Sequence, residues 1–467
     1  MGSLTSLMNL SREALMADQE ALSITANNVA NQNTPGYTRQ VANWQTVDLV
    51  TIDGVSYGDG VSVSAVSQRD RILEQRVQQQ TQVQARSGAL QTALQQVESI
   101  FSLSASGASA GSTALGSALD SFFNSLSALE GNPSDASTRQ GVLMAAGNLA
   151  SVFNSSASQL AQVTSDLNQQ AGDIAGQVNS LTATIASLNQ QIASSGAHGD
   201  AGALEDQRQS AIRQLSQYIG LNQITTEGNG IALTTANGAV LVSGSQSFAV
   251  STTTVAGATR ILAGVPPQDV TSGLTGGQLG GVLQARDQRL PAYASSLDNL
   301  AYAIGTAVNS QNALGLDQSG NPGQPIFSLP ATASGAAAAI QVVATSPAAI
   351  AAAAVGEGSA GNSNAIALAN IASQNILGGQ TAGGFLASFL GQVGNDAAGA
   401  ATDNVAQQAT LTQVTSQRNA LSGVSLSEEA SNLTQYQRSY EAAAKVFAIV
   451  NSIMASALNL GVQTTVS

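Results

Sequence analysis

Two stretches of the sequence carry the Gly-x-Ser-x-Gly string that surrounds the nucleophile of many serine hydrolases. They are Gly54-Val-Ser56-Tyr-Gly58 and Gly107-Ala-Ser109-Ala-Gly111. Hydrolysis also needs a strand before the serine, a helix after it and a histidine base. The first string lies among turn-forming glycines and the second in a Ser/Gly/Ala linker, while the single histidine, His198, sits in a Ser/Gly-rich loop. We therefore predict no catalytic residue.

Two further patterns resemble ligand sites. Gly356-Glu-Gly358-Ser-Ala-Gly361 matches a dinucleotide fingerprint, but it follows an alanine-rich segment that is a poor strand former. No acidic residue follows before Asn395 to bind a ribose. The Asp317–Gly320 loop begins like a calcium site, yet it lacks spaced carboxylates and a closing glutamate. We predict no cofactor and no metal site.

The composition narrows the class of protein further. The chain has 467 residues, of which 43% are hydrophobic and 9% charged, and its net charge is −13. Such an acidic chain is repelled by phosphate backbones, so we exclude a nucleic-acid partner. Without cysteine there is no disulfide and no thiol chemistry. Residues 1–12 show no signal-peptide pattern, so if the protein works outside the cell we expect it to leave without a cleaved signal. Ala331–Val355 is interrupted by Gly335 and Pro347, so we expect no membrane partner.

The elements that organise the chain are long helices, beginning at the N-terminus. From Ser3 to Asn33 no Gly or Pro interrupts the sequence, which stops at Thr34-Pro35-Gly36. Apolar or small residues recur here at alternating spacings of three and four, the pattern of a coiled-coil seam. They are Leu7, Leu10, Ala14, Ala17, Ala21 and Ile24.

The C-terminal segment repeats this pattern for more than four heptads. Its predicted seam comprises Leu426, Ala430, Leu433, Gln437, Tyr440, Ala444, Phe447, Asn451, Met454 and Leu458. Ser425 and Glu428 form a capping-box pattern at its start, and Gly461 is a stop signal. Two such helices at opposite chain ends bury their seams against each other or another copy. We predict the assembly seam at Leu7, Leu10, Ile24, Leu433, Tyr440, Phe447 and Met454.

The middle of the chain is predicted to be helical with short strands. Helical periodicity covers 70–101, 115–129, 137–194, 204–218, 279–312, 364–376 and 385–421. Residues 41–66 read as short strands, and 221–262 as a β patch with a hairpin at Asn237-Gly238.

The predicted fold is therefore mainly α with a small β portion. Residues 1–40 and 422–467 form a terminal coiled-coil domain, and 41–221 with 263–421 form an elongated helical-bundle middle domain. The small β patch, 222–262, lies within that middle domain.

The borders of the terminal helices carry a family resemblance. Ala26-Asn-Asn-Val-Ala-Asn31 followed by Thr34-Pro-Gly-Tyr-Thr-Arg-Gln40 resembles the signature of flagellar axial proteins, which form rod, hook and hook-associated structures. The C-terminal Gly423–Ala430 run, with its following Tyr and Glu residues, is similar to the closing helix of that group. Gly276–Asp287 and Asn362–Ala365 are most similar to the first of the two hook–filament junction proteins.

The resemblance implies a structural role and a set of partners. It implies a ring of copies between the hook protein and the second junction protein, outside the cell, after type III flagellar export. A chaperone is expected to cover the C-terminal helix before export. Asn27, Asn28, Pro35, Gly36 and Tyr37 are expected to form the turn that orients the inner helix. The outer β domain of longer relatives is expected to be absent, with only a loop near 317–330 in its place.

Three alternatives remain open from the sequence. In the first alternative the chain is another axial protein, such as the hook protein or the second junction protein. A circular-dichroism spectrum dominated by β structure would favour the hook protein. In the second alternative the chain is a secreted serine hydrolase that uses Ser56 and His198. Loss of a measurable hydrolytic activity in His198→Ala would support it. In the third alternative the chain is a helical binding module with no assembly role. Deletion of 426–467 would distinguish this case from our prediction, in which motility is lost.

Overall fold

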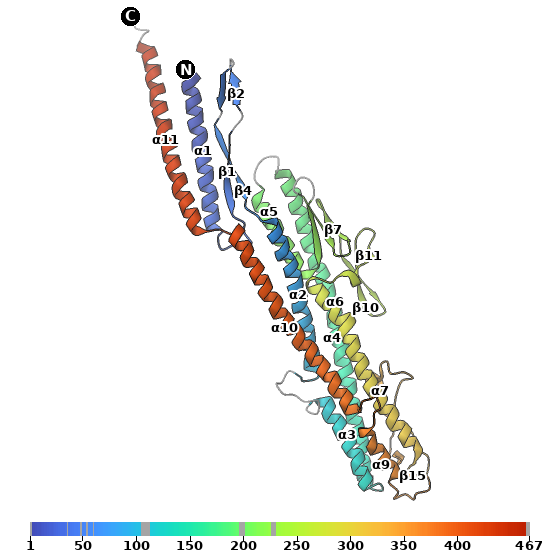
Figure 1. Cartoon of the computed structure of the whole chain (residues 1–467). Coiled ribbons are helices and arrows are strands. Elements are labelled where there is room, and N and C mark those ends of the chain that lie inside the picture. The colour runs from blue at the N-terminus through green and yellow to red at the C-terminus, as the bar shows by residue number, and fades with distance from the viewer. Residues whose placement is uncertain are drawn as a thin grey trace.

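The computed structural model describes residues 2–34, 36–46, 49–52, 55–58, 60–103, 113–195, 201–225 and 230–463. The molecule is a long helical shaft from which a pair of terminal helices projects, with both chain ends at the same end of the molecule (Figure 1). It is 68% helical and 13% strand, which confirms the predicted mainly α fold with a small β portion.

The projecting part consists of two antiparallel helices and a β ribbon. Helix α1 spans Gly2–Ala30 and packs against α11, Leu426–Gln463. On the other side of α1 lies the ribbon, in which β1 (Gln40–Thr46) pairs with β4 (Val61–Ser67) (Figure 1). Its tip is formed by β2, Leu49–Ile52, paired with β3, Val55–Gly58. The ribbon thus lies beside α1, whereas the sequence assigned these residues to the middle domain.

The shaft is built from helices close to the predicted ranges. They are α2 (Arg71–Ile100), α3 (Ala114–Gly131), α4 (Ala136–Ser195), α5 (Gly202–Tyr218), α6 (Gly277–Gln284), α7 (Leu290–Leu314), α9 (Ser363–Asn370) and α10 (Ala382–Ser422). A π-helical turn, Ala285–Arg289, joins α6 to α7. Side-chain caps fix three of the helix starts: Asp70 caps α2, Thr113 caps α3 and Thr381 caps α10.

Two small sheets lie against the long helix α4. The first contains β5 (Leu221–Thr225), β6 (Ile231–Thr235), β7 (Val240–Ser243) and β8 (Gln246–Ser247). The second contains β9 (Ser251–Val255), β10 (Ala258–Ala263) and β11 (Gln268–Asp269). The predicted hairpin joins β6 to β7, with Gly238 at φ 87°. The β region runs to Asp269, beyond the predicted end at residue 262.

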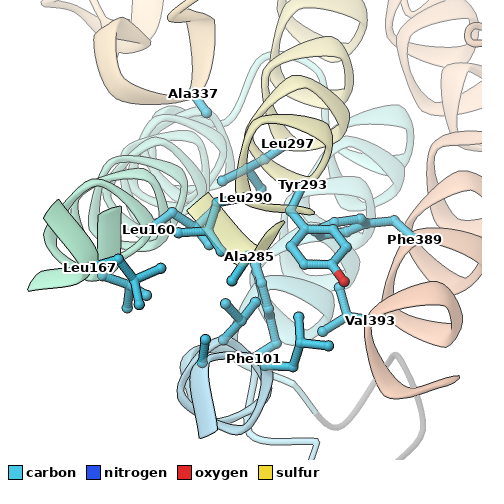
Figure 2. Packing of buried hydrophobic residues seen from close by; sticks show 14 of the residues in the cluster. Phe101, Leu160, Leu167, Ala285, Leu290, Tyr293, Leu297, Ala337, Phe389 and Val393 are labelled. Atoms are coloured by element: carbon cyan, nitrogen blue, oxygen red, sulfur yellow. The ribbon is translucent and has the colours of Figure 1, made fainter. Parts of the chain in front are cut away.

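The core runs along the shaft between α2, α4, α7 and α10. Figure 2 shows Phe101, which directly follows α2, near Tyr293 on α7 and Phe389 on α10, and the ring centroids of Phe101 and Phe389 are 5.2 Å apart. Leu160 on α4 and Leu290 on α7 are both 2% exposed. Each such side chain contributes about 1.5–3 kcal/mol by leaving water. These side chains form a continuous apolar core along the shaft.

The far end of the shaft is closed by residues 315–354, which include the alanine-rich segment. These residues contain the short helix α8 (Ala336–Ala339) and the two-residue strands β12 (Gly315–Leu316), β13 (Phe327–Ser328), β14 (Gln341–Val342) and β15 (Ala353–Ala354). Ala336, Ile340 and Ala352 are fully buried. Small side chains let this irregular backbone pack closely against α4 and α7.

Candidate assembly site

Two polar contacts fix the register of α1 against α11. Asn28 Nδ2 donates a hydrogen bond to Glu429 Oε2 at 3.1 Å. Asp18, ten residues earlier on α1, is hydrogen-bonded to Ser439, ten residues later on α11. Asn28 and Glu429 are each 1% exposed, so the first contact is buried, whereas Asp18 is 3% exposed and its partner Ser439 lies at the exposed edge of the interface. The two helices are therefore in one antiparallel register along this length.

The predicted seam residues occupy different environments along this pair. Ile24, near the base, is 4% exposed. Leu433, Phe447 and Met454 are half-buried. Leu7, Leu10 and Tyr440 are 43%, 45% and 39% exposed. Extending the register from the two polar contacts brings Ile24 opposite Leu433 and Leu10 opposite Phe447. Ser11 and Val450, nearer the chain ends, are 5% and 2% exposed, so the seam is closed there too, and Leu7, Leu10 and Tyr440 lie beside it.

The phase of α11 differs from the sequence expectation at alternate seam positions. Gln437 and Asn451 were expected to face the seam, but both are exposed. One residue earlier in each case, Tyr436 is half-buried and Val450 is 2% exposed. The ring of Tyr436 also meets that of Trp44 on β1, with centroids 6.0 Å apart. The interface buries apolar side chains at these positions and leaves the amides in water.

Beside this seam α11 carries a second apolar stripe that nothing in the described chain covers. Val446, Ile449 and Ile453 are 46%, 60% and 47% exposed. By length and composition alone, the helical stretch Ala382–Leu458 qualifies as able to cross a membrane, although only 6% of its most apolar window is buried. The sequence analysis considered only Ala331–Val355 as a membrane span, so Ala382–Leu458 is a candidate that only the structure brought up. An uncovered stripe of this kind marks an interaction surface.

Asp18 places a carboxylate inside this helix pair. Burial raises the pKa of Asp18 above its usual value, and the hydrogen bond from Ser439 offsets part of that effect. Ser11 and Thr25, one heptad to either side of Asp18, are 5% and 2% exposed and bond back to carbonyls of their own helix. This face of α1 is therefore polar and closely packed, and it gains little from the hydrophobic effect.

The turn after α1 is organised by the side chain of Asn28. Its Oδ1 accepts from Tyr37 Oη at 3.0 Å and from Gln40 N at 2.9 Å, and its Nδ2 donates to Gln40 O at 2.7 Å. The start of β1 is thus tied to the end of α1 by one buried amide. Asn27 is exposed, and it accepts from Asn31 at the helix end. Pro35, another member of the predicted motif, lies outside the described residues.

A buried arginine on α10 clamps the same turn from the shaft side. Arg418 donates to the carbonyls of Gly36 and Tyr37, each at 3.1 Å, and to Thr38 Oγ1 at 2.9 Å. Its Nε donates to Glu74 Oε1 on α2 at 2.6 Å. Arg418 and Glu74 are both 3% exposed. This clamp was not predicted, because its partners lie hundreds of residues apart and no local pattern connects them.

Gly36 is required at the centre of this clamp. Its φ is +84°, in the left-handed region that side chains disfavour. A Cβ built there would lie 1.8 Å from Arg213 Nη2 on α5. Arg213 Nη1 in turn donates to Glu74 Oε2 at 3.3 Å. The glycine of the family motif therefore gives two arginines room to converge on the turn.

A second ion pair joins the turn to the base of α11. Arg39 Nε donates to Glu429 Oε1 at 2.7 Å, and Arg39 Nη1 also pairs with Glu428. The backbone N–H of Arg39 donates to Ser422 O at 2.9 Å. Glu428, expected to cap α11 together with Ser425, is instead paired with Arg39. Arg39, Glu428 and Glu429 all belong to the stretches that carried the family resemblance, so the sequence motifs already contained the residues of this ion pair.

The catalytic and ligand patterns are placed as follows. Ser56 lies on β3, while Gly54, Ser109 and His198 lie outside the described residues. In the glycine loop at 356–361, Glu357 Oε2 accepts from Ala354 N at 2.9 Å and from Ser363 N at 3.3 Å. A carboxylate of the chain itself thus occupies the donors that a phosphate would need.

In the calcium-like loop at Asp317–Gly320, the carboxylate of Asp317 is hydrogen-bonded to backbone groups of the loop region itself. Asp317 Oδ1 accepts from the backbone N–H groups of Ser319 and Asn321, both at 2.8 Å. No group of three or more potential metal-ligating side chains occurs among the residues that the structure describes.

Three family models match the chain in separate regions. Residues 94–327 match the helical domain of flagellar hook-associated protein FlgK. Residues 8–38 match the flagella basal body rod protein family, and 416–460 match the C-terminal family of flagellar basal body rod FlgEFG proteins. The two rod models contain Asn28 and Glu429, the residues that join α1 to α11.

Curated relatives and a solved structure agree with these matches. Flagellar hook-associated protein 1 of Salmonella typhimurium is 30% identical over 340 residues, covering 70% of this chain and 60% of that protein. The Bacillus subtilis protein of the same name is 28% identical over 499 residues, covering 97% of each. The chain thus spans 60% of the length of its enterobacterial relative. The hook junction protein FlgK from Burkholderia pseudomallei has the same fold, with a TM-score of 0.67 and 19% identity over 74% of this chain and 100% of that one.

Proposed function

Because this chain belongs to the flagellar hook-associated protein FlgK family, we propose that it is a structural subunit that joins hook to filament by self-assembly. The observation that carries the proposal is the α1–α11 pair, which projects from the shaft with one seam closed and a second apolar stripe uncovered. A monomer gains nothing from leaving such a stripe in water. A ring of copies would bury it.

The clamp at Arg418 and the Arg39–Glu429 pair support a positioning role for the turn. They tie the end of α1, the start of β1 and the base of α11 to the top of the shaft through buried and partly buried hydrogen bonds. Arg and carboxylate pairs of this kind fix direction as well as distance. We propose that this joint sets the angle at which the terminal pair enters the ring.

The proposed partners follow from the family. They are copies of this chain, the hook protein on one side and the second junction protein on the other, with type III export to the cell exterior before assembly. A cytoplasmic chaperone would cover α11, since a stripe such as Val446, Ile449 and Ile453 favours aggregation until it is buried. The outer β domain of longer relatives is proposed to be missing, because residues 315–354 carry only two-residue strands.

The test uses two variants of α11 that differ only in which face they change. Ile449→Asp with Ile453→Asp places charge on the uncovered stripe, and Gln437→Asp with Asn451→Asp places it on exposed polar positions of the same helix. All four side chains are exposed in the free chain, so both proteins should fold and show the parent circular-dichroism spectrum. In cells lacking the native protein, the first variant should abolish swimming and release unassembled filament subunits, while the second should restore swimming.

Restored swimming by both variants would contradict the proposal. Another axial protein remains the alternative, and labelling this chain at the junction between hook and filament distinguishes it from a hook or distal position. The hydrolase alternative is tested directly by assaying purified protein and His198→Ala for ester and peptide hydrolysis. The binding-module alternative predicts that deletion of 426–467 leaves swimming intact.

A further inference from the structure

A polar cavity lies where the β ribbon meets the shaft. It has a volume of about 220 Å³ and is lined by the end of β4, the first turns of α2, the start of α5 and the strands β5 and β6. Figure 1 shows α5 beside the base of the ribbon, and the two are in contact. Since a water molecule takes about 30 Å³, the cavity has room for a small ion and several waters.

The lining of this cavity is rich in nitrogen donors. Three arginines contribute to it: Arg69 just after β4, Arg71 at the start of α2 and Arg208 on α5. Three glutamines share the wall with them, namely Gln75, Gln209 and Gln223. The whole chain has only 15 lysine and arginine residues against 28 acidic ones. Three arginines around one small cavity are therefore a local concentration of positive charge in an acidic protein.

Both carboxylates that line the cavity are already paired with arginines. Glu74 accepts from the two arginines that converge on the clamp described above. Glu205 pairs with Arg69 at 3.4 Å, and the neighbouring Asp206 also pairs with Arg69. These carboxylates therefore do not make the cavity an acidic site that would attract a cation.

Two polar atoms in the wall lack partners within the chain. Arg69 Nε and Ser67 Oγ are buried and have no hydrogen-bond partner among the residues that the structure describes. A buried donor without an acceptor costs free energy, so such a group calls for a water or an ion. Both residues line the cavity, so a bound acceptor could supply the missing partners.

The electrostatics of Arg208 favour a negative ligand. This residue is 2% exposed, and its Nη1 donates to the neutral Oδ1 of Asn189 at 2.9 Å. Burial lowers the pKa of its guanidinium to about 10, Glu205 partly offsets this effect, and the charges of Arg69 and Arg71 lower the pKa further. An anion among the three guanidinium groups would offset their mutual repulsion.

We infer that this cavity binds a small oxoanion, and that a tetrahedral ion such as inorganic phosphate fits it better than a carboxylate. The lining residues come from five elements and surround the space on several sides. A tetrahedral anion accepts hydrogen bonds from many directions, whereas a carboxylate accepts them mainly near one plane. The bound ion would join the base of the ribbon to two helices of the shaft. This site does not depend on the proposed function.

Isothermal titration of the purified full chain with sodium phosphate tests the inference, at pH 7 and at an ionic strength held constant with sodium chloride. We expect saturable binding of one phosphate ion per chain. Arg71→Gln removes a cation from the lining and Gln75→Glu adds a carboxylate to it, so each should weaken binding by at least about tenfold. Sodium acetate, titrated in the same way, should also bind at least about tenfold more weakly than phosphate.

The matched controls make the same two changes further along α2, outside the lining. They are Arg76→Gln and Gln79→Glu, and both should bind phosphate as the parent does. All four altered side chains are exposed, so every variant should keep the circular-dichroism spectrum of the parent.

Absence of saturable phosphate binding would overturn the inference. Equal binding by the lining variants and the controls would also overturn it, because the ion would then be held elsewhere on the surface. Acetate binding as tight as that of phosphate would overturn the preference for a tetrahedral ion. The titration uses unassembled protein, so its failure leaves the proposed junction role intact, and failure of the swimming test leaves the phosphate site intact.

Discussion

Replacing Arg418 by methionine should weaken the joint between shaft and terminal helices by a measurable amount. Methionine keeps the length and apolar stem of the side chain but removes every donor. The change leaves Glu74 Oε1 without its partner at 2.6 Å and the carbonyls of Gly36 and Tyr37 without theirs at 3.1 Å. Breaking a buried ion pair costs about 3–5 kcal/mol. Because Arg213 still reaches Glu74 at 3.3 Å, we expect the lower end, about 3 kcal/mol.

The chain supplies its own probe for this measurement. Trp44 is the single tryptophan, and its ring lies 6.0 Å from that of Tyr436 at the base of α11. Its fluorescence during urea unfolding should report separation of the ribbon from α11, and Arg418→Met should lower the midpoint. The control is Arg438→Met on the exposed face of α11, which should change stability by less than about 0.5 kcal/mol.

The double variant Arg418→Met with Glu74→Met separates lost charge pairing from lost packing. If the cost comes from an uncompensated buried carboxylate, the double variant should be more stable than Arg418→Met alone. A midpoint for Arg418→Met equal to that of the control would refute the clamp, and so would a double variant that costs the sum of the two single changes.

Three further predictions concern single positions. Asp18→Asn should stabilise the α1–α11 pair at pH 7. Burial raises the pKa of the Asp18 carboxyl in the folded protein above its usual 3.8. The free energy of unfolding therefore falls as the pH rises from the unfolded-state pKa through the folded-state pKa. In unfolding followed from pH 3 to 7 by tryptophan fluorescence, the gain should vanish at the acid end, and a gain independent of pH would contradict the argument. Gly36→Ala should cost about 1–3 kcal/mol, since it adds strain at φ +84° and displaces Arg213, whereas Gly378→Ala, at φ +59° in open space, should cost less in the same urea assay. Phe153→Ala, at a fully buried core position, should cost about 3–5 kcal/mol in denaturation followed by circular dichroism, and a cost below 1 kcal/mol would contradict its place in the core.

The extent of the helices was predictable because their signals are local. Residues 137–194 were expected to form one helix, and α4 spans Ala136–Ser195. Asp70 caps α2, and Gly238 turns the β6–β7 hairpin. Helical periodicity, caps and turn glycines act within a few residues, so a single sequence displays them in full.

The phase of α11 was only half predictable. Its sequence carries two adjoining apolar stripes, and heptad spacing alone favours Gln437 and Asn451 as readily as Tyr436 and Val450. The choice depends on which stripe meets α1 and which stays open, and that is decided by the register set at Asn28–Glu429 and Asp18–Ser439. A pattern on one helix contains no information about where its partner lies.

The sequence by itself therefore determined that the chain has long helices, two heptad-bearing ends and motifs of the flagellar axial group. Those features follow from covalent geometry and local hydrogen bonding, which act between near neighbours in the chain. Only the tertiary structure decided that Arg418, Glu74 and Gly36 form one clamp, and which stripe of α11 meets α1. Those features depend on groups separated by hundreds of residues, which come together only when the whole shaft is packed.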